Sequence, residues 1–413
     1  RAVLFAVDTG SPGFGIEESL AELGQLAWSA EVTVVDTLVQ RRDAPDSATY
    51  LGEGKVAELA TLMDEKEAEL AICDDELTPA QVNNLTEQLG LPVVDRTQLI
   101  LDIFAARASS REGKVQVELA QLRYLLPRLT GKGSALSRLG GGIGTRGPGE
   151  TKLETDRRHL RRRMAELKRE LDRIRQRRHL QRESRKQSLA PVAALVGYTN
   201  AGKSTMLNTL AGAGVMTEDR LFATLDPTIR AVQLPRSEQS LFLVDTVGFI
   251  RKLPHELVAA FRATLEEVVE ADMLIHVVDS SHPHMWQQVE AVEEALVELG
   301  VAEKPRVTAF NKADLLGAEL LEALVSRTPY SCAVSALSAE GCTALLELVE
   351  EVLPERHVVR TYRVPYSDAG VASWLHESGR VLHEQFDAEA MTLQVEIRQQ
   401  MAERVRHFEE PSD

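Results

Sequence analysis

Short apolar runs alternate with longer amphipathic segments through the first quarter of the chain. The runs with the composition of strands are Val3–Val7, Val32–Val35, Leu70–Cys73 and Leu91–Val94. Helical spacing occupies segments between them, such as Gly52–Leu62 and Pro79–Gly90. Alternation of strand and helix predicts a parallel sheet covered by helices. We therefore expect a small N-terminal α/β subdomain over residues 1–108.

From about Glu112 the apolar residues follow a heptad spacing. They are Val115, Leu119, Leu122, Leu126 and Leu129 and, beyond a glycine-rich run, Leu153, Leu160, Met164, Leu167, Leu171 and Ile174. This spacing indicates two helices, each with one apolar seam. Because eight glycines within residues 131–150 interrupt helix formation, the two helices most simply fold back on each other. We predict an antiparallel hairpin over residues 109–188, called the arm below, with residues 131–150 as its tip.

Strand-like and helix-like segments alternate again in the second half of the chain. The runs that are apolar enough to be central parallel strands are Val192–Val196, Leu241–Asp245, Met273–Asp279 and Arg306–Phe310. They predict an α/β domain over residues 189–356. The last segment has strand-like runs at Val358–Val364 and Met391–Ile397 around a helical stretch at Ala369–His376. We expect a small C-terminal α/β domain over residues 357–413, and an α/β fold class for the whole chain.

A phosphate-binding loop directly follows the strand Val192–Val196. The residues that we expect to contact nucleotide there are Gly197, Tyr198, Thr199, Asn200, Ala201, Gly202, Lys203, Ser204 and Thr205. They form G-x-x-x-x-G-K-S after a strand and before a helix, which is the context that the P-loop requires. Loop N–H groups converge on the β-phosphate, Lys203 neutralises the β- and γ-phosphates, and the Ser204 hydroxyl ligates Mg²⁺.

Two further segments complete the predicted phosphate and metal site. The strand Leu241–Asp245 ends in the D-x-x-G motif made by Asp245, Thr246, Val247 and Gly248. Asp245 can hold Mg²⁺ through a water molecule, and the Gly248 N–H can sense the γ-phosphate. The segment before this strand, called switch I below, consists of Phe222, Ala223, Thr224, Leu225, Asp226, Pro227 and Thr228. Its polar character predicts a loop ordered by Mg²⁺ and γ-phosphate, with Thr224 and Thr228 as alternative metal ligands.

The motif N-K-x-D predicts that the base is guanine. It is formed by Asn311, Lys312, Ala313 and Asp314 directly after a strand. A carboxylate at Asp314 accepts from guanine N1–H and the 2-amino group, and adenine offers neither donor there. Asn311 and Lys312 would brace the loop and cover the base. The residues expected to contact the guanine oxygen through the backbone are Ser335, Ala336 and Leu337. GTP is thus the expected substrate and GDP the product.

Hydrolysis is expected to depend on Lys203, Thr224 and Gly248. The residue after Gly248 is Phe249, at the place where Ras-type GTPases carry a glutamine that orients the attacking water. Phenylalanine cannot hydrogen-bond to that water. We therefore predict slow intrinsic hydrolysis that a partner accelerates by reordering the switches or by contributing a polar group. The alternative is that another residue of this chain, for example in the arm, positions the water.

Charge is unevenly distributed along the chain. The net charge is −16, but residues 151–190 hold 15 Lys and Arg against 6 Asp and Glu, which gives that segment +9 and the remainder −25. A basic helix on an acidic protein indicates a polyanionic partner; the alternative is a solvated charged face. With three cysteines, no Cys/His zinc spacing and no long apolar run, we expect no disulfide framework, no transition-metal site and no membrane span.

The tip contains a pattern that imitates a dinucleotide-binding loop. Residues 142–147, GIGTRG, match G-x-G-x-x-G, but a helix precedes them where a dinucleotide fold has a strand. We therefore reject that interpretation. The tip also carries Lys132, Arg138 and Arg146. Glycine permits close backbone approach and arginine pairs with phosphate, so a thin basic loop of this kind suits insertion among RNA strands.

Taken together, these motifs resemble the HflX-type GTPases, which are ribosome-associated members of the translation-factor-related class of P-loop GTPases. The resemblance rests on GYTNAGKST at 197–205, FATLD at 222–226, DTVGFI at 245–250, NKAD at 311–314 and GGGIGTRGPGETKLETDRR at 140–158. The last run is the most specific, because the other motifs are shared widely among GTPases. The resemblance covers residues 1–355 well and the tail loosely.

The resemblance implies a function on the large (50S) ribosomal subunit. It implies that loop 131–150 and the basic helix 151–187 reach the 23S rRNA near the peptidyl-transferase region, and that GTP controls the splitting of stalled or stressed ribosomes. It also implies that Thr224, rather than Thr228, is the switch ligand of Mg²⁺, and that a hydrophobic residue at Phe249 is usual. Some members are reported to bind ATP in their N-terminal region, but no phosphate loop occurs in residues 1–107. We expect a cytoplasmic monomer with at most peripheral membrane association.

Two other functions stay open from the sequence. The arm could bind a protein partner, or a membrane-bound one, as a coiled coil, and the N-terminal domain could drive an RNA-remodelling NTPase. The residues that favour a polyanion over a coiled-coil partner are Arg157, Arg158, Arg161, Arg162, Arg163, Arg175, Arg177 and Arg178. Salt dependence separates the two, because only binding to nucleic acid weakens steeply as salt rises.

Overall fold

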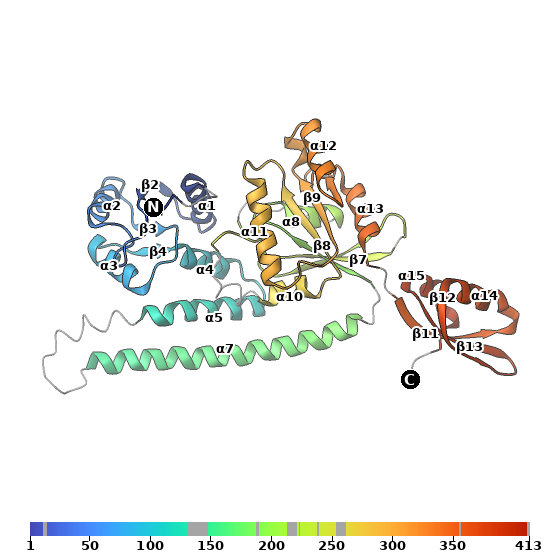
Figure 1. The fold of residues 1–413 in the computed structure, drawn as a ribbon. Helices are drawn as coiled ribbons and strands as arrows, with labels where there is room; N and C mark the ends of the chain where they lie inside the picture. Colours follow the sequence, from blue (N-terminus) through green and yellow to red (C-terminus); the bar gives the residue numbers. More distant parts are fainter. Residues whose placement is uncertain are drawn as a thin grey trace.

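The computed structural model describes residues 1–10, 15–129, 148–186, 190–212, 221–222, 224–237, 239–252, 262–354 and 357–410. Its strands form three sheets, and helices flank each of them (Figure 1). The N-terminal and C-terminal sheets lie on opposite sides of the central one, and the long hairpin runs beneath the N-terminal and central sheets (Figure 1). This architecture confirms the predicted α/β class. Most of the predicted tip, residues 130–147, lies outside the described residues.

The N-terminal sheet is parallel and has the strand order β2-β1-β3-β4. Its strands are β1 (Ala2–Asp8), β2 (Val34–Arg41), β3 (Leu70–Cys73) and β4 (Val93–Asp95). Its helices are α1 (Ile16–Ser29), α2 (Glu53–Glu65), α3 (Pro79–Leu89) and α4 (Arg96–Arg107). The sequence did not predict α1 or α4. It predicted all four strands, but β2 begins two residues later and ends six residues later than the expected run Val32–Val35.

Side chains alternate along β1 between two separate cores. Leu4 lies in the core under α1 and α4, whereas Phe5 lies in the core under α2 and α3. Both side chains are almost fully buried. Successive residues of a strand point to opposite faces, so a strand that is apolar at every position must be covered on both sides. The continuous apolar run Val3–Val7 therefore specifies the centre of a two-faced sheet.

The arm is a two-helix hairpin, as predicted from the heptads. It consists of α5 (Arg111–Arg128) and α7 (Pro148–Lys186), and α7 begins at Pro148, inside the segment expected to be the tip loop. The residues that pack between the two helices are Val115, Leu119, Leu122, Met164, Leu167 and Leu171. Arg111 pairs with Glu170 and Glu118 pairs with Arg163. Because the partner number falls as the α5 number rises, the helices run antiparallel.

One face of α5 belongs to the arm and another to the N-terminal domain. Val117, Ala120 and Tyr124 join the core under α1 and α4, while Val115 and Leu119 join the seam with α7. The helix α7 has 39 residues and α5 has 18, so much of α7 extends past its partner (Figure 1). The hairpin is therefore anchored to the N-terminal domain through α5.

The central sheet has the strand order β10-β9-β8-β5-β7-β6. Its strands are β5 (Val192–Val196), β6 (Thr228–Gln233), β7 (Ser240–Asp245), β8 (Met273–Asp279), β9 (Arg306–Asn311) and β10 (Ser331–Ala333). Only β6, among these strands, runs antiparallel to its neighbour. The helices and short turns are α8 (Lys203–Leu210), α10 (Arg262–Glu270), α11 (Met285–Glu298), η1 (Ala313–Leu315), α12 (Ala318–Arg327) and α13 (Cys342–Val352). The four predicted central strands are present.

The C-terminal domain is an antiparallel sheet with the order β11-β13-β12. Its elements are β11 (His357–Pro365), η2 (Tyr366–Asp368), α14 (Ala369–Ser378), β12 (Gly379–Phe386), β13 (Ala390–Arg398), α15 (Gln399–Arg404) and η3 (Arg406–Phe408). The sequence did not predict β12. Its side chains are mostly exposed, so it lacks the apolar alternation by which a half-buried strand is recognised. No helix in the described part of the chain is long and apolar enough to cross a membrane.

The seam of the arm gives a stability prediction. Leu167 is fully buried between α5 and α7, so Leu167→Ala removes packed methyl groups and leaves a cavity. We expect the free energy of opening of the hairpin, measured by hydrogen exchange of α7 amides, to fall by about 2 kcal/mol, the low end for such changes because the seam can partly collapse. The neighbouring exposed Lys168→Ala should change it by less than about 0.5 kcal/mol. Equal effects of the two variants would contradict the seam.

Candidate nucleotide site

The predicted P-loop connects β5 to α8 and is held in place by Asn311. The Asn311 side chain donates to the Ala201 carbonyl at 2.8 Å and accepts from the Ala336 N–H at 2.9 Å. Gly202 has φ 94°, and a Cβ there would lie 2.2 Å from Asn311 Nδ2, so no other residue fits this position without displacing the amide. One side chain thus joins the P-loop to the loop of residues 335–337. This is the bracing role expected of Asn311.

Lys203 lies buried at the start of α8. Its Nζ donates to the carbonyls of Gly197 at 3.2 Å and Tyr198 at 2.8 Å. Burial lowers the pKa of Lys203 to about 8, although Asp245 favours the charged form. A Cβ at Gly248 would lie 2.8 Å from this Nζ. The fold therefore brings together Lys203 and Gly248, which the sequence placed at the γ-phosphate.

The three predicted metal-site residues also converge. The Ser204 hydroxyl donates to Asp245 Oδ2 at 2.5 Å and lies 2.7 Å from Thr224 Oγ1. Burial raises the pKa of Asp245, opposed by Lys203 and the Ser204 hydrogen bond. The other carboxylate oxygen, Oδ1, is buried and has no hydrogen-bond partner among the residues that the structure describes. Two hydroxyls and an unsatisfied carboxylate oxygen are hard ligands that fit Mg²⁺ and its waters, and the geometry favours Thr224 over Thr228.

The predicted base loop begins where β9 ends. Lys312 has φ 61°, and its Nζ lies 2.6 Å from Asp279 Oδ2. Asp314 is exposed, Ser335 is fully buried, and Leu337 is 85% exposed. The exposed Asp314 carboxylate is available to hydrogen-bond the edge of a base. The exposed Leu337 side chain, on the neighbouring loop, is available to pack against the face of the base. The arrangement agrees with the expected roles of these residues, which remain predictions.

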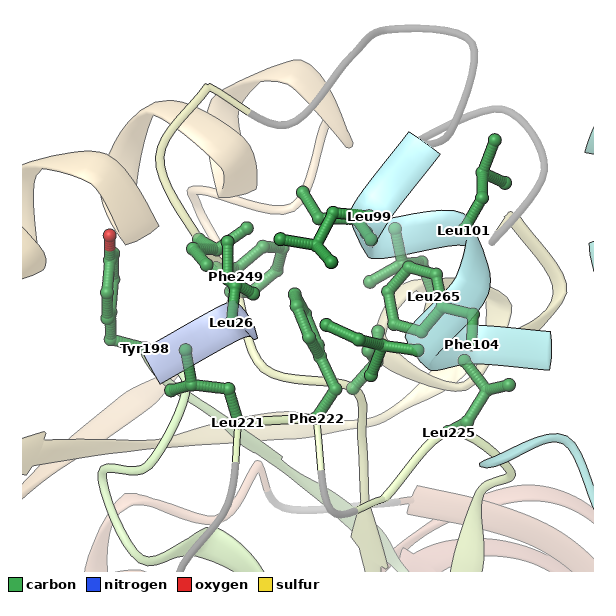
Figure 2. Close-up of a cluster of buried hydrophobic side chains, with 14 of the residues drawn as sticks. Leu26, Leu99, Leu101, Phe104, Tyr198, Leu221, Phe222, Leu225, Phe249 and Leu265 are labelled. Atoms are coloured by element: carbon green, nitrogen blue, oxygen red, sulfur yellow. The ribbon is translucent and has the colours of Figure 1, made fainter. Parts of the chain in front are cut away.

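Switch I and the segment 247–250 around Phe249, together called the switches, pack against the N-terminal domain, which the sequence did not predict. Figure 2 shows a cluster in which Leu26 of α1 and Phe104 of α4 meet Phe222 and Leu225 of switch I and Phe249. The rings of Phe104 and Phe222 are edge to face, with centroids 4.6 Å apart. The same cluster continues to one face of the central sheet through Leu265. One continuous core therefore joins the two domains through the switches.

Phe249 occupies this core with its side chain only 5% exposed. Its N–H donates to the Gly197 carbonyl at 3.1 Å, and its carbonyl accepts from the Thr199 N–H at 2.7 Å. The backbone is therefore tied to the P-loop while the ring packs among Leu26 and its neighbours (Figure 2). The side chain that replaces a glutamine is used for packing between domains.

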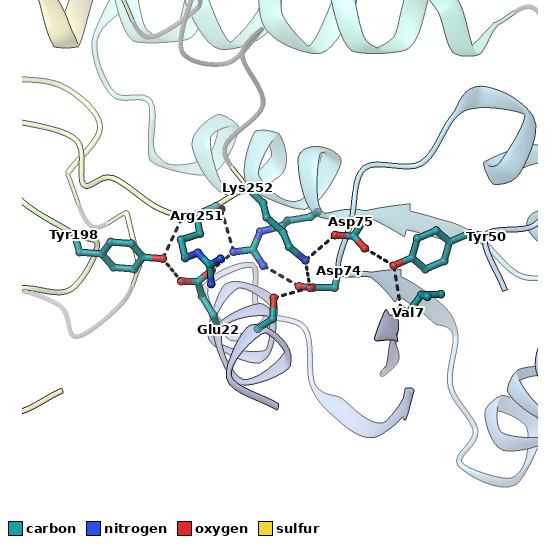
Figure 3. Close-up of polar contacts among 10 residues, drawn as sticks. Val7, Glu22, Tyr50, Asp74, Asp75, Tyr198, Arg251 and Lys252 are labelled. Carbon is teal, nitrogen blue, oxygen red and sulfur yellow. Dashed lines mark hydrogen bonds and ion pairs between the residues drawn. The ribbon is translucent and has the colours of Figure 1, made fainter. Parts of the chain in front are cut away.

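A polar network accompanies the apolar contact (Figure 3). Arg96 of α4 is 1% exposed; it donates to Asp74 Oδ1 at 2.9 Å and to the Arg251 carbonyl at 3.3 Å, and it pairs with Glu22. Glu22 also accepts from the Tyr198 hydroxyl. The Arg251 N–H donates to that hydroxyl at 3.0 Å. The network thus ties the P-loop and the segment after Gly248 to the N-terminal domain.

Lys252 extends the same network. Its Nζ lies 2.5 Å from Asp74 Oδ2 and 2.6 Å from Asp75 Oδ1. Burial raises the pKa of Asp74, opposed by Lys252, and burial lowers the pKa of Arg96 to about 10. Figure 3 shows the two acidic side chains between Lys252 and the β-sheet of the N-terminal domain. Asp74 also pairs with Arg96, and Asp75 accepts from the Tyr50 hydroxyl, so Lys252 adds a second positive charge beside these two carboxylates.

Asp226 of switch I also faces the N-terminal domain. Its carboxylate accepts from the backbone N–H groups of Ser109 at 2.9 Å and Ser110 at 2.7 Å, and from both serine hydroxyls. The sequence placed Asp226 among the nucleotide-contacting residues, but both of its carboxylate oxygens are engaged by these serines. Neither serine carries a motif, so no sequence signal pointed to this contact.

Profiles of three protein families match the chain. The family described as GTP-binding GTPase N-terminal matches residues 17–105, GTP-binding GTPase Middle Region matches residues 107–185, and 50S ribosome-binding GTPase matches residues 192–312. These matches cover most of the chain in three consecutive parts.

Two relatives with similarity over most of the chain are described as GTPase HflX. One from Caldanaerobacter subterraneus subsp. tengcongensis is 48% identical over 408 residues, covering 99% of this chain and 93% of that protein. One from Escherichia coli is 41% identical over 379 residues, covering 88% of each. A crystal structure of a GTP-binding protein from Sulfolobus solfataricus in complex with GDP is 26% identical, covers 85% of this chain and 98% of that one, and has a TM-score of 0.45.

The lowered pKa of Lys203 predicts proton uptake on nucleotide binding. With a pKa of about 8, the Lys203 ammonium of the nucleotide-free protein is half deprotonated near pH 8, and phosphates would raise that pKa. Binding of GDP at about pH 8.5 should therefore take up a fraction of a proton, and affinity should fall as pH rises through that range. Calorimetry in buffers of different ionisation enthalpy measures the uptake. At about pH 6.5 the lysine is charged in both states, so its contribution to the uptake should vanish and only exchange by the GDP phosphate should remain; equal uptake at both values would exclude Lys203 as the source.

The position of Asp314 predicts a change of base specificity. Asp314→Asn replaces two acceptors by one acceptor and one donor, so guanine loses a hydrogen bond to a charged group and xanthine, with an oxygen at C2, gains one. We expect affinity for GTP to fall at least about 100-fold, and XTP binding to appear. Fluorescence titration with labelled GTP and XTP measures both. Asp368→Asn, an exposed aspartate in the C-terminal domain, is the matched control and should leave GTP binding unchanged.

Proposed function

This chain belongs to the HflX family of GTPases, and from that premise we propose that it is a GTP-switched factor that binds the large (50S) ribosomal subunit and splits or rescues stalled ribosomes. Family membership makes it a GTPase with a ribosome-binding GTPase domain. The finer proposal is that the arm, through loop 131–150 and α7, docks on 23S rRNA near the peptidyl-transferase region. Hydrolysis then permits release.

The observation that carries this proposal is the row of cationic side chains on α7. Arg158, Arg161 and Arg162 are exposed on a helix that projects along the base of the molecule (Figure 1). The segment 151–190 has a net charge of +9 on a chain whose total is −16. Because the rest of the protein repels RNA, a polyanion must approach along the arm. Arginine also pairs with phosphate in a bidentate geometry that lysine lacks.

The packing of the arm argues against a partner helix. Three of the apolar heptad residues of α7 that could recruit one, Met164, Leu167 and Leu171, pack against α5. A coiled-coil partner would have to displace α5, which also packs into the N-terminal core through Val117 and Tyr124. Nor does an RNA-remodelling ATPase fit the N-terminal domain, because residues 1–107 contain no P-loop pattern. An RNA-binding arm therefore accounts best for the exposed charge.

The proposed chemistry uses the residues around the P-loop. Ser204 and Thr224 would hold Mg²⁺ directly and Asp245 through water, and the ion would neutralise charge on the phosphates. Lys203 would stabilise the β- and γ-phosphates, and Gly248 would sense the γ-phosphate. Since the Phe249 ring is buried and cannot orient water, we expect slow intrinsic hydrolysis that the ribosome stimulates.

The test is co-sedimentation with large ribosomal subunits. Binding should be strong with a nonhydrolysable GTP analogue, weak with GDP, and should fall about 10³-fold or more between 50 and 200 mM salt if several phosphates are contacted. Arg158→Glu with Arg162→Glu should remove most of the binding while nucleotide affinity is kept. The matched control, Arg41→Glu with Arg327→Glu, makes the same charge change at exposed positions away from the arm. Salt-independent binding, or equal binding of both double variants, would contradict the proposal.

A further inference from the structure

We propose that Asp226 is a positioning residue that ties switch I to the first turn of α5, so that ligation of Mg²⁺ by Thr224 and the placement of the arm depend on each other. The group formed by Asp226, Ser109, Ser110 and Gly113 is called the switch I–α5 contact. The proposal deepens the proposed function, since it rests on Thr224 as the metal ligand and on the arm as the docking element.

The contact uses nearly every acceptor that Asp226 offers. Oδ2 accepts from Ser109 N at 2.9 Å, Ser109 Oγ at 2.7 Å and Ser110 N at 2.7 Å, and Oδ1 accepts from the Ser110 hydroxyl. The Ser110 Oγ in turn accepts from Gly113 N at 2.9 Å and is the N-cap of α5. The Ser110 hydroxyl therefore donates its proton to Asp226 of switch I and accepts from the Gly113 N–H of the helix. A carboxylate at this end also interacts favourably with the helix dipole.

Gly113 makes the close approach possible. A Cβ at this helical position would lie 2.5 Å from Asp226 Oδ1 and 3.2 Å from Ser110 Oγ. Glycine in a helix is less favourable than alanine by about tenfold or less in equilibrium terms, so its presence in the first turn needs a reason. The room it leaves is filled by the Asp226 carboxylate. Helix α5 thus has a residue of low helix propensity at the point where switch I contacts it.

The contact limits where Thr224 can go. Thr224 precedes Asp226 by two residues, and two extended residues span about 7 Å. The intervening Leu225 is buried in the interdomain cluster (Figure 2). With Asp226 fixed, Thr224 Oγ1 lies 2.7 Å from Ser204 Oγ, where Mg²⁺ would be ligated. Switch I is therefore held in its metal-binding arrangement from the N-terminal side.

The same contact reaches the arm. Ser109 and Ser110 link α4 to α5, and α5 packs along α7 through Leu119 and Leu167. A shift of α5 on docking would move the donors of Asp226, and release of switch I after hydrolysis would free the first turn of α5. Coupling of this kind is reciprocal: the factor by which RNA at the arm changes GTP affinity equals the factor by which GTP changes RNA affinity.

The first experiment needs no ribosome. Gly113→Ala places a methyl group against the Asp226 carboxylate while improving helix propensity, and Asp226→Ala removes the carboxylate. We expect both to weaken a nonhydrolysable GTP analogue in Mg²⁺ by about tenfold, as judged by fluorescent-nucleotide titration, and to leave GDP affinity unchanged. The matched control is Gly54→Ala, in α2, where an added Cβ meets nothing within 4 Å; it should alter neither. An unchanged ratio of analogue to GDP affinity in both test variants overturns the proposal.

A mutant cycle separates positioning from general loss of fold. Ser109→Ala lies outside α5 and removes one hydroxyl donor of Asp226. If the two residues act through one contact, Ser109→Ala lowers the ratio of analogue affinity to GDP affinity in the native protein. In a protein that already carries Asp226→Ala, the same change has no further effect on that ratio. Additive effects would overturn the proposal, and the cycle stands even if Gly113→Ala fails to fold.

The second experiment adds large ribosomal subunits. We expect Asp226→Ala to sediment with them at low salt, because α7 is intact, but to lose most of the difference between the GTP analogue and GDP. A full nucleotide difference in this variant overturns the coupling. Failure of the native protein to bind subunits at all would remove the proposed function instead, while the ribosome-free ratio would still decide whether Asp226 positions Thr224.

Discussion

The apolar cluster that joins the N-terminal domain to the switches is the interaction on which the rest of the structure depends. Leu26 and Phe104 contribute from one domain, and Phe222 and Phe249 from the nucleotide site. Burying these side chains removes apolar surface from water, so any movement of the switches that opens the cluster costs free energy. The nucleotide site and the N-terminal domain therefore cannot change independently.

Buried charge gives this contact a single arrangement. Arg96 and Asp74 are almost fully buried, and Lys252 and Glu22 complete their pairing from the two sides. A buried ion pair contributes little net stability because desolvation opposes it, but removing one partner is costly. An apolar surface alone tolerates sliding, whereas these charges fit only one register. The network thus specifies how the domains meet, and the apolar cluster supplies most of the affinity.

Local pattern was sufficient for the elements and insufficient for the contact between them. Continuous apolar runs located β1, β5 and β8, and the heptads located the arm, because burial within one element leaves a periodic signal. Strand β12 and helix α4 lack such a signal: one is mostly exposed, and the other is buried on several faces. The motifs placed the residues around Lys203 together. They could not show that Phe249 packs on Leu26, because these residues lie in segments far apart in the sequence. The local pattern of each segment carries no sign of the other.

The order of the chain adds a second route between the arm and the nucleotide. Helix α7 ends at Lys186, and β5 begins at Val192 and leads directly into the P-loop. The other helix of the arm, α5, begins at Arg111 and is capped by Ser110, which binds Asp226 of switch I. The C-terminus of α7 is therefore followed in the chain by the strand that precedes Ser204, and the N-terminus of α5 binds the segment that carries Thr224. Since these two residues meet at the proposed metal site, we expect a displacement of the arm to act on both sides of that site. Asn311 holds the P-loop through the Ala201 carbonyl, so switch I is the side that we expect to yield.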